Sequence, residues 1–579
     1  MKIFIFLLCF FGFFYVTYSI EIKNIDTKNI VTDIYHPIYQ DYQYWTEYHK
    51  KKQILDTKSL SIKKYDFLKK DNINLKKELL IYDIEKLCLS FYKKNNRIND
   101  VFFSRKHIRY FDVKTPISEI FYIHDIFNKK ILGGLFTHSP NKNINYSIEY
   151  KNVFFDKKFN NHFLITFNQW KENSYYKLWG HYLKNNLCNY TNNVNSFLDK
   201  KNINHERLYI SFIKKIIPTY HHDDKKSIFF RNYIEYTKYF TNSLEKINEL
   251  KNYQKNLFFY KNYNSLIFKK KKKYNIEVGF LYEKIYSQFF YNDFFHKKKF
   301  NNQTYNKKIN VFTIVTKIHD IFNKKINFNF YKKWILDNKL RSTPLQINFQ
   351  LDTNLYSNLH FLTKILIKKN IYSNFTNFLI FNKNGNFYNN TINNLLNFKS
   401  INFSFFSEKK LNISFKTSKI NNINFFTTNN KLLNWNYINL WNLKIKNTNY
   451  INNFQFNNII LLQKQSSDNL IFYIPSFFYK STISYKKTYF DKSLLIKTGC
   501  SINYLNQFFS KNFSYPFDLF SNNEYYGNHF LKKTFINYFL NFKIFRTNFY
   551  TSIQNIHFNK PFFHQDIFIR LGLFWNIFT

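Results

Sequence analysis

The segment Asp566–Thr579 alternates between two kinds of side chain along its whole length. Its odd-numbered residues up to Ile577 are all apolar, whereas the even-numbered positions include Arg570 and Asn576. Because the side chains of a β-strand point alternately to opposite faces, one face of this segment is wholly apolar. The pattern therefore predicts a strand with one buried face, in either a soluble sheet or a membrane barrel.

The first residues of the chain predict an export signal. Lys2 precedes an apolar run from Ile3 to Val16, and small residues lead to a cleavage point near Ser19, so residues 1–19 are interpreted as a signal peptide. The rest of the chain contains no run close to the roughly 18 to 20 consecutive apolar residues of a spanning helix. An exported chain of this kind can enter a membrane only as a closed barrel, because every backbone polar group must be satisfied inside the hydrocarbon.

The composition excludes some classes of function. The 579 residues carry 86 Lys and Arg against 37 Asp and Glu, a formal net charge of +49. Such a charge is typical of proteins that bind nucleic acid, but an exported protein leaves the compartment that holds it. The excess of Lys, Asn, Ile, Phe and Tyr is typical of AT-rich codons, so part of the charge reflects mutational bias. Beyond the signal, Cys88, Cys188 and Cys500 are widely spaced and indicate neither a disulfide framework nor a zinc site.

Short alternating segments recur over residues 105–579. Examples are Leu345–Asp352, Ile144–Tyr150 and Leu411–Lys416, in which apolar and polar residues alternate. Segments of about ten such residues separated by polar turns are typical of antiparallel transmembrane barrel strands, and the length of this region predicts about 14 to 20 of them. Residues 20–104 alternate less regularly and are rich in Lys, so we expect a periplasmic or plug-like extension before the barrel.

Several motifs, in order, resemble those of the porin family of Bacteroidota. The segment Ile54–Tyr65 resembles the opening of the family's sequences. Two later segments, Lys114–Ile120 and Asn143–Lys151, resemble the family's next two segments. Near the C-terminus, Phe539–Ile544 and Ile569–Phe578 resemble the family's last two strands. The resemblance implies an all-β fold, a transmembrane antiparallel barrel of the outer membrane. Together with the AT-rich composition, it indicates an endosymbiont with a reduced genome.

The resemblance also implies roles for particular residues. In outer-membrane barrels the closing strand serves as a signal for the barrel assembly machinery, and the residues expected to form it here are Leu571, Gly572, Leu573, Trp575, Ile577 and Phe578. The polar face is expected to line the pore, with Arg570 and Lys416 as candidate pore-lining residues. The expected partners are therefore outer-membrane lipid, the assembly machinery and small hydrophilic solutes.

No catalytic, cofactor or metal site is predicted. The sequence His221–Asp224 could be imagined as a set of metal ligands, but neighbouring side chains on an extended loop point apart, which favours a polar loop. The nonapeptide IHDIFNKKI occurs twice, at Ile123–Ile131 and Ile318–Ile326, and a duplicated hairpin is one interpretation.

The expected function is that of an outer-membrane porin for passive diffusion of small hydrophilic solutes, with a mild preference for anions. Three alternatives stay open: a closed structural or receptor barrel, a secreted protein of an AT-rich parasite, and an outer-membrane enzyme. The oligomeric state is not predicted.

Overall fold

The computed structural model describes residues 44–46, 108, 110–112 and, between residues 116 and 578, the strands given below with a few adjoining turn residues. The expected signal peptide (1–19), nearly all of the expected extension (20–104) and the His221–Asp224 sequence lie outside the described residues. Among the described residues, no helix is long and apolar enough to cross a membrane.

All regular secondary structure in the described residues is β-strand. The wall strands are, in chain order, β3 (Ile117–Asp125), β4 (Lys130–Asn141), β5 (Ile144–Phe155), β6 (Lys158–Trp170), β7 (Tyr176–Asn192), β8 (Leu198–Lys215), β9 (Lys226–Glu245), β10 (Lys251–Lys270), β11 (Tyr274–Asp293), β12 (Gln303–His319), β13 (Lys325–Leu336), β14 (Leu345–Tyr356), β15 (Leu359–Ile371), β18 (Leu395–Ser407), β19 (Leu411–Thr427), β20 (Leu432–Ile451), β21 (Phe454–Ser466), β22 (Phe477–Tyr489), β23 (Leu494–Asn506), β26 (Lys533–Ile544), β27 (Thr547–His557) and β28 (Phe568–Phe578). Short additional strands are β1 (Tyr44–Thr46), β2 (Tyr110–Asp112), β16 (Ile380–Phe381), β17 (Phe387–Tyr388), β24 (Phe513–Ser514) and β25 (Leu519–Asn522).

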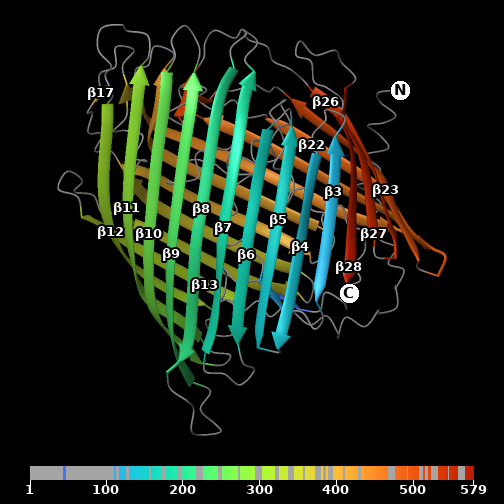
Figure 1. The fold of residues 1–579 in the computed structure, drawn as a ribbon, viewed down its shortest axis with the longest axis horizontal. Coiled ribbons are helices and arrows are strands. Elements are labelled where there is room, and N and C mark those ends of the chain that lie inside the picture. Colours follow the sequence, from blue (N-terminus) through green and yellow to red (C-terminus); the bar gives the residue numbers. More distant parts are fainter. Residues whose placement is uncertain are drawn as a thin grey trace.

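The wall strands form one closed barrel (Figure 1). Neighbouring wall strands pair antiparallel, and the last strand, β28, pairs with the first, β3, with Phe574 opposite Phe121. The all-β antiparallel barrel predicted from the sequence is confirmed, with 22 wall strands in the described part of the chain. This exceeds the expected range of about 14 to 20, because some connections are very short: only Asn452 and Asn453 separate β20 from β21.

The two ends of the barrel differ in the length of their connections. At one end, two-residue turns follow β20 and β26 and a short turn follows β22, with positive φ at Asn452 (49°), Phe490 (49°), Asp491 (46°) and Phe545 (48°). Positive φ is what tight hairpin turns require. Since β28 runs parallel to those three strands, it finishes at this end, which we name the turn end. The opposite end, the loop end, has longer connections, such as the one between β23 and β26.

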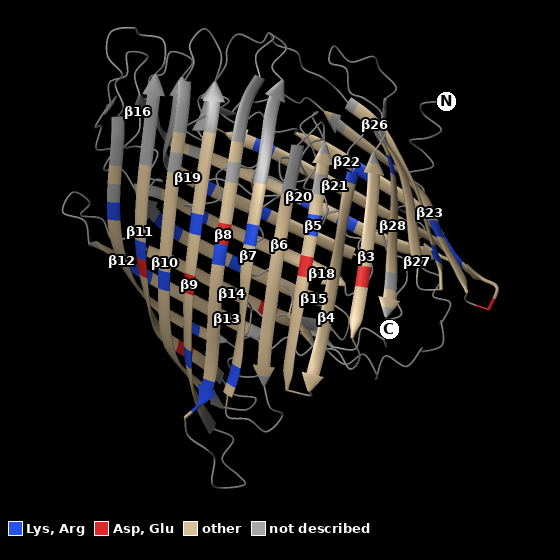
Figure 2. Ribbon diagram, in the orientation of Figure 1, with Lys and Arg blue, Asp and Glu red and all other residues tan. Residues whose placement is uncertain are grey.

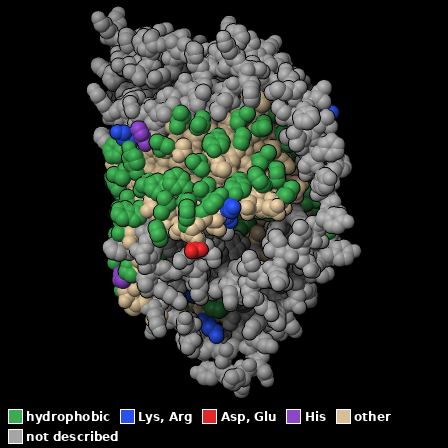
Figure 3. Space-filling view, turned by 90° about the vertical axis from the view of Figure 1, so that its right-hand side faces the viewer, with side chains coloured by type: hydrophobic (Ala, Val, Ile, Leu, Met, Phe, Trp, Pro, Cys, Tyr) green, Lys and Arg blue, Asp and Glu red, His purple; other side chains and the backbone are tan. Residues whose placement is uncertain are grey.

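Alternation along each strand separates an outward surface from an inner surface. On β5, Ile148 and Tyr150 are 40% and 44% exposed, whereas Ser147, Glu149 and Lys151 between and beside them are 1%, 4% and 0% exposed. The same parity continues from strand to strand through the hydrogen-bonded register. Figure 3 shows the result as an apolar band across the described part of the wall.

The two copies of IHDIFNKKI span two hairpin connections that are not equivalent. The first joins β3 to β4 and the second joins β12 to β13. Since β3 and β12 run in opposite directions, the two connections lie at opposite ends of the barrel. Ile123 and Ile131 face inward and are 5% and 3% exposed, whereas Ile318 and Ile326 lie on the outward face. The match in sequence is therefore not a repeat of one structural unit.

Candidate functional site: the barrel lumen

The inward-facing side chains of the wall are the candidate functional site, because in a barrel they are the groups that a passing solute meets. They divide into two arcs of different charge. The paired arc covers the inner face of β5–β13 and contains both acidic and basic residues, as Figure 2 shows on the strands that face the viewer. The basic arc covers the inner face of β15–β28.

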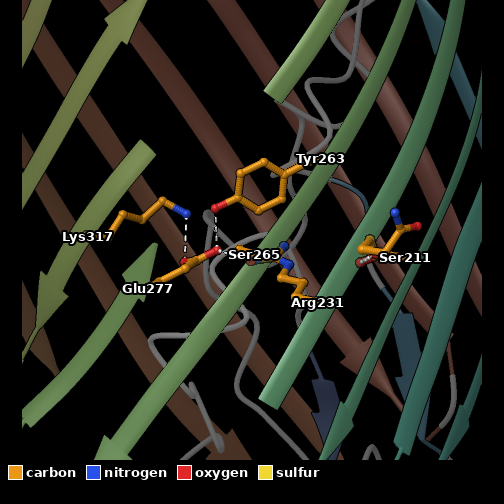
Figure 4. Close-up of polar contacts among 7 residues, drawn as sticks. Ser211, Arg231, Tyr263, Ser265, Glu277 and Lys317 are labelled. Atoms are coloured by element: carbon orange, nitrogen blue, oxygen red, sulfur yellow. Dashed lines mark hydrogen bonds and ion pairs between the residues drawn. The ribbon is translucent and has the colours of Figure 1, made fainter. Parts of the chain in front are cut away.

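The paired arc is organised around Glu277 on β11 (Figure 4). Its Oε2 accepts from Lys317 Nζ at 2.8 Å, and its Oε1 lies 3.8 Å from Arg231 Nη1. The hydroxyl groups of Tyr263 and Ser265 donate to the same Oε1 at 2.6 and 3.1 Å. Glu277 is 5% exposed and Arg231 4%. A buried carboxylate in this setting is stabilised only while its donors remain, because a lone charge would have lost its hydration without compensation.

Two further carboxylates of this arc also lie close to basic side chains. Glu283, also on β11, lies 3.7 Å from Lys261 Nζ and 3.5 Å from Lys333 Nζ. Glu235 on β9 lies 3.7 Å from Arg207 Nε. These contacts join residues on adjacent or next-adjacent strands, so they stiffen the wall across its strands while leaving little uncompensated charge on it.

A segment that precedes the wall lies inside the barrel against this arc. β2 pairs in parallel with β1, not with a wall strand, so the wall begins at Ile117. The Tyr110 hydroxyl is 2.7 Å from His181 Nδ1, and Asn168 Nδ2 donates to the Phe111 carbonyl at 2.9 Å. The Tyr110 side chain belongs to an apolar cluster with inward-facing rings of the wall. The described residues from 108 to 112 therefore occupy part of the lumen.

The basic arc has a different composition. No acidic residue occurs in any strand from β15 to β28. The strand register places the following basic residues on the inner face: Lys364, Lys368, Lys416, Lys444, Lys446, Lys480, Lys486, Lys497, Lys543 and Arg570. Lys497 donates to the neutral side chain of Gln455, at its Oε1, over 3.4 Å. The charge excess of the whole sequence thus reaches the inner wall on this side.

The two candidate pore-lining residues lie on the inner face. Lys416 stands between Asn402 of β18 and Asn442 of β20 in the register. Arg570 is 7% exposed and stands opposite Ser552 of β27. The two residues lie on different strands of the basic arc, and the structure does not bring them together into one site.

The residues of the expected assembly strand form β28. On its outward face Leu571 and Trp575 are 53% and 48% exposed, and Leu573 and Ile577 share that face. Gly572 faces inward, where an added Cβ would overlap the ring of Tyr550. Phe578 pairs with Ser118 of β3 after a register shift. A role of this strand in assembly stays a prediction.

The Glu277 cluster was not predicted from the sequence. Its members are far apart in the chain and meet only through the register of β9–β12. Among the described residues there is no group of three or more His, Cys, Asp or Glu residues that could hold a metal ion.

Comparisons with known proteins agree with this architecture. The model of a family described as "Putative porin" matches residues 38–196, which include β1 and the wall from β3 to β7. No curated protein matches the chain significantly.

Solved structures share the fold at very low sequence identity. The copper transporter OprC has a TM-score of 0.61 at 8% identity, with 80% of each chain covered. The ferric enterobactin receptor PfeA from Pseudomonas aeruginosa has a TM-score of 0.59 at 8% identity, covering 81% of this chain and 83% of its own. The FrpB iron transporter from Neisseria meningitidis has a TM-score of 0.57 at 10% identity, covering 80% and 82%. With the porin match, they identify this protein as a β-barrel of the outer membrane.

Proposed function

We propose that the protein is a channel through which small hydrophilic solutes diffuse passively across the outer membrane, with a preference for anions. The observation that carries the proposal is the basic arc, an inner wall from β15 to β28 whose strands contain lysines and arginine but no carboxylate. Rings of basic side chains along a pore favour anions. The paired arc contributes less selectivity, because its charges compensate each other.

We also propose roles for residues 1–19 and 20–104, which lie almost wholly outside the described residues, and for β28. Residues 1–19 would direct export, and residues 20–104 would form a periplasmic or plug-like extension before the barrel. The barrel assembly machinery would recognise the closing strand β28. We propose no enzymatic activity, cofactor or bound metal.

The test is ion flow through the purified full-length protein in a planar bilayer, with a salt gradient across it. We expect the sign of the reversal potential to show that anions cross the channel more readily than cations. Replacing Lys444 and Lys446 by Gln should move that potential towards zero, because both face inward on β20. Lys419→Gln, on the outward face of the neighbouring strand, is the matched control and should leave it unchanged. A cation-selective channel would contradict the proposal.

A closed receptor barrel is the second candidate, and one observation favours it. Residues 108 and 110–112 lie within the lumen, where the Tyr110 hydroxyl contacts His181 and Asn168 donates to the Phe111 carbonyl. If the rest of the extension fills the barrel in the same way, the full-length protein conducts no ions in the bilayer experiment. Absence of conductance from correctly folded protein would therefore favour the receptor over the channel.

A further inference from the structure

The lipid-facing surface changes character near the loop end of the barrel. On β19, the outward side chains from the turn end are Leu411, Ile413, Phe415 and Thr417, followed by Lys419. Four other strands between β13 and β21 show the same order, with mainly apolar outward residues first and an exposed lysine nearer the loop end. We name these exposed lysines the lysine collar: Lys332 (β13), Lys369 (β15), Lys399 (β18), Lys419 (β19) and Lys464 (β21).

The collar places like charges next to each other. Lys399 and Lys419 are direct partners in the register of β18 and β19. Like charges directly opposite one another destabilise a sheet, and no strand from β15 to β28 contains a carboxylate to offset them. Elsewhere on the outward surface the protein does neutralise such a lysine, since Lys184 Nζ lies 3.5 Å from Glu206 Oε1. An anion from outside the chain would remove the repulsion at the collar.

The surroundings of the collar indicate what kind of anion fits. Lys419 Nζ lies 5.7 Å from the centre of the Tyr437 ring, and Lys332 Nζ lies 5.1 Å from the centre of the Trp334 ring. Below them, Phe415 and Trp441 are 41% and 40% exposed on the lipid-facing surface. A ligand that follows this surface must be charged at the collar and apolar beneath it. An acylated molecule with phosphate groups has that shape, whereas a free inorganic anion would use only the upper part.

We propose that the lysine collar binds the phosphate groups of an anionic, acylated glycolipid in the outer leaflet of the membrane. In outer-membrane barrels the long loops are extracellular and the short turns periplasmic, which puts the collar at the outer leaflet. Basic residues next to a membrane surface attract anionic lipid headgroups. The binding holds the glycolipid around β13–β21 and does not depend on whether the pore is open or closed.

The experiment uses the purified full-length protein in an uncharged detergent, titrated with bis-phosphorylated lipid A and followed by native mass spectrometry. We expect Lys399→Gln/Lys419→Gln to weaken binding by about 20- to 30-fold, and Lys419→Gln alone by about fivefold. Lys487→Gln is the matched control, because Lys487 is also exposed and outward and lies 5.1 Å from the Tyr489 ring, but at the turn end. It should leave lipid binding unchanged.

Two further titrations decide the chemistry without any variant. Dephosphorylated lipid A should bind the unmodified protein at least tenfold more weakly than the phosphorylated form. Inorganic phosphate at millimolar concentration should not displace the lipid. Equal binding of both lipids would overturn the proposal, because the lysine collar would then not recognise the phosphate groups. Complete displacement by inorganic phosphate would overturn it as well, since the site would then be one for free anions.

Discussion

A charge placed on the outward face of the closing strand tests the assignment of faces most sharply. Leu573 is the central outward residue of β28, between Leu571 and Trp575, and it pairs with Phe549 and Tyr122 of the flanking strands. Leu573→Arg would put a guanidinium in the middle of the apolar band. A cost of about 2 to 4 kcal/mol in the free energy of unfolding is expected for Arg at the bilayer midplane.

The strand geometry predicts how this cost falls with depth. Two residues along a strand advance about 6.8 Å, which is about 5 Å along the membrane normal at a tilt of about 40°. Leu571→Arg therefore lies about 5 Å from the centre of an apolar band about 25 Å tall, and Ile569→Arg about 10 Å from it. We expect the cost to decrease in the order Leu573, Leu571, Ile569, with about 0 to 1 kcal/mol at Ile569.

The assay is reversible urea unfolding of the barrel in lipid vesicles, with gel mobility before and after heating as the check that each variant has folded. Arg570→Lys is the control, because Arg570 is 7% exposed on the inner face and the substitution keeps its charge. It should cost less than about 1 kcal/mol. Equal losses for Leu573→Arg and Arg570→Lys, or no gradient with depth, would refute the assignment of faces.

Two further substitutions, Glu277→Gln and Gly572→Ala, test the inner wall. Glu277→Gln should destabilise the barrel by about 3 to 5 kcal/mol, because it leaves buried Arg231 without its carboxylate. Glu206→Gln, which breaks a largely exposed pair, should cost at most about 1 kcal/mol. Both are measured by the same urea titration, and equal effects would show that the buried cluster does not stabilise the wall. Gly572→Ala should cost about 1 to 3 kcal/mol, because the added methyl overlaps the buried Tyr550 ring. Tyr550→Leu in the same chain should recover part of the loss, and no recovery would place the strain elsewhere.

Alternation was sufficient to predict from the sequence that the chain is built of β-strands, whereas the choice of a barrel over a soluble sheet also needed the export signal and the family resemblance. A period of two is a local property, so the residues of Asp566–Thr579 and Ile144–Tyr150 by themselves indicate which of their side chains share a face. The number of strands could not be obtained in this way. It depends on the length of each connection, and a turn as short as Asn452–Asn453 carries almost no signal in a chain where Asn is common throughout.

The candidate site was only partly predictable, because register is not local. Glu277 meets Lys317 across one strand boundary and Arg231 across two, and nothing in their spacing along the chain predicts those contacts. Conversely, the two copies of IHDIFNKKI are identical in sequence and face opposite sides of the wall, because the strand pairing around each copy sets its orientation. The excess of lysine was visible in the composition, but its division between the basic arc and the lysine collar required the register of every strand.

Passive flux of solutes through the full-length protein distinguishes an open channel from a closed barrel. Liposomes containing the folded barrel are mixed with isosmotic solutions of small hydrophilic solutes, in pairs of equal size that carry opposite charge, and swelling is followed by light scattering. We expect swelling without any energy source, and faster swelling with the anionic member of each pair. No swelling with any solute, from protein shown to be folded by its gel mobility, would contradict the claim that this barrel is an open channel.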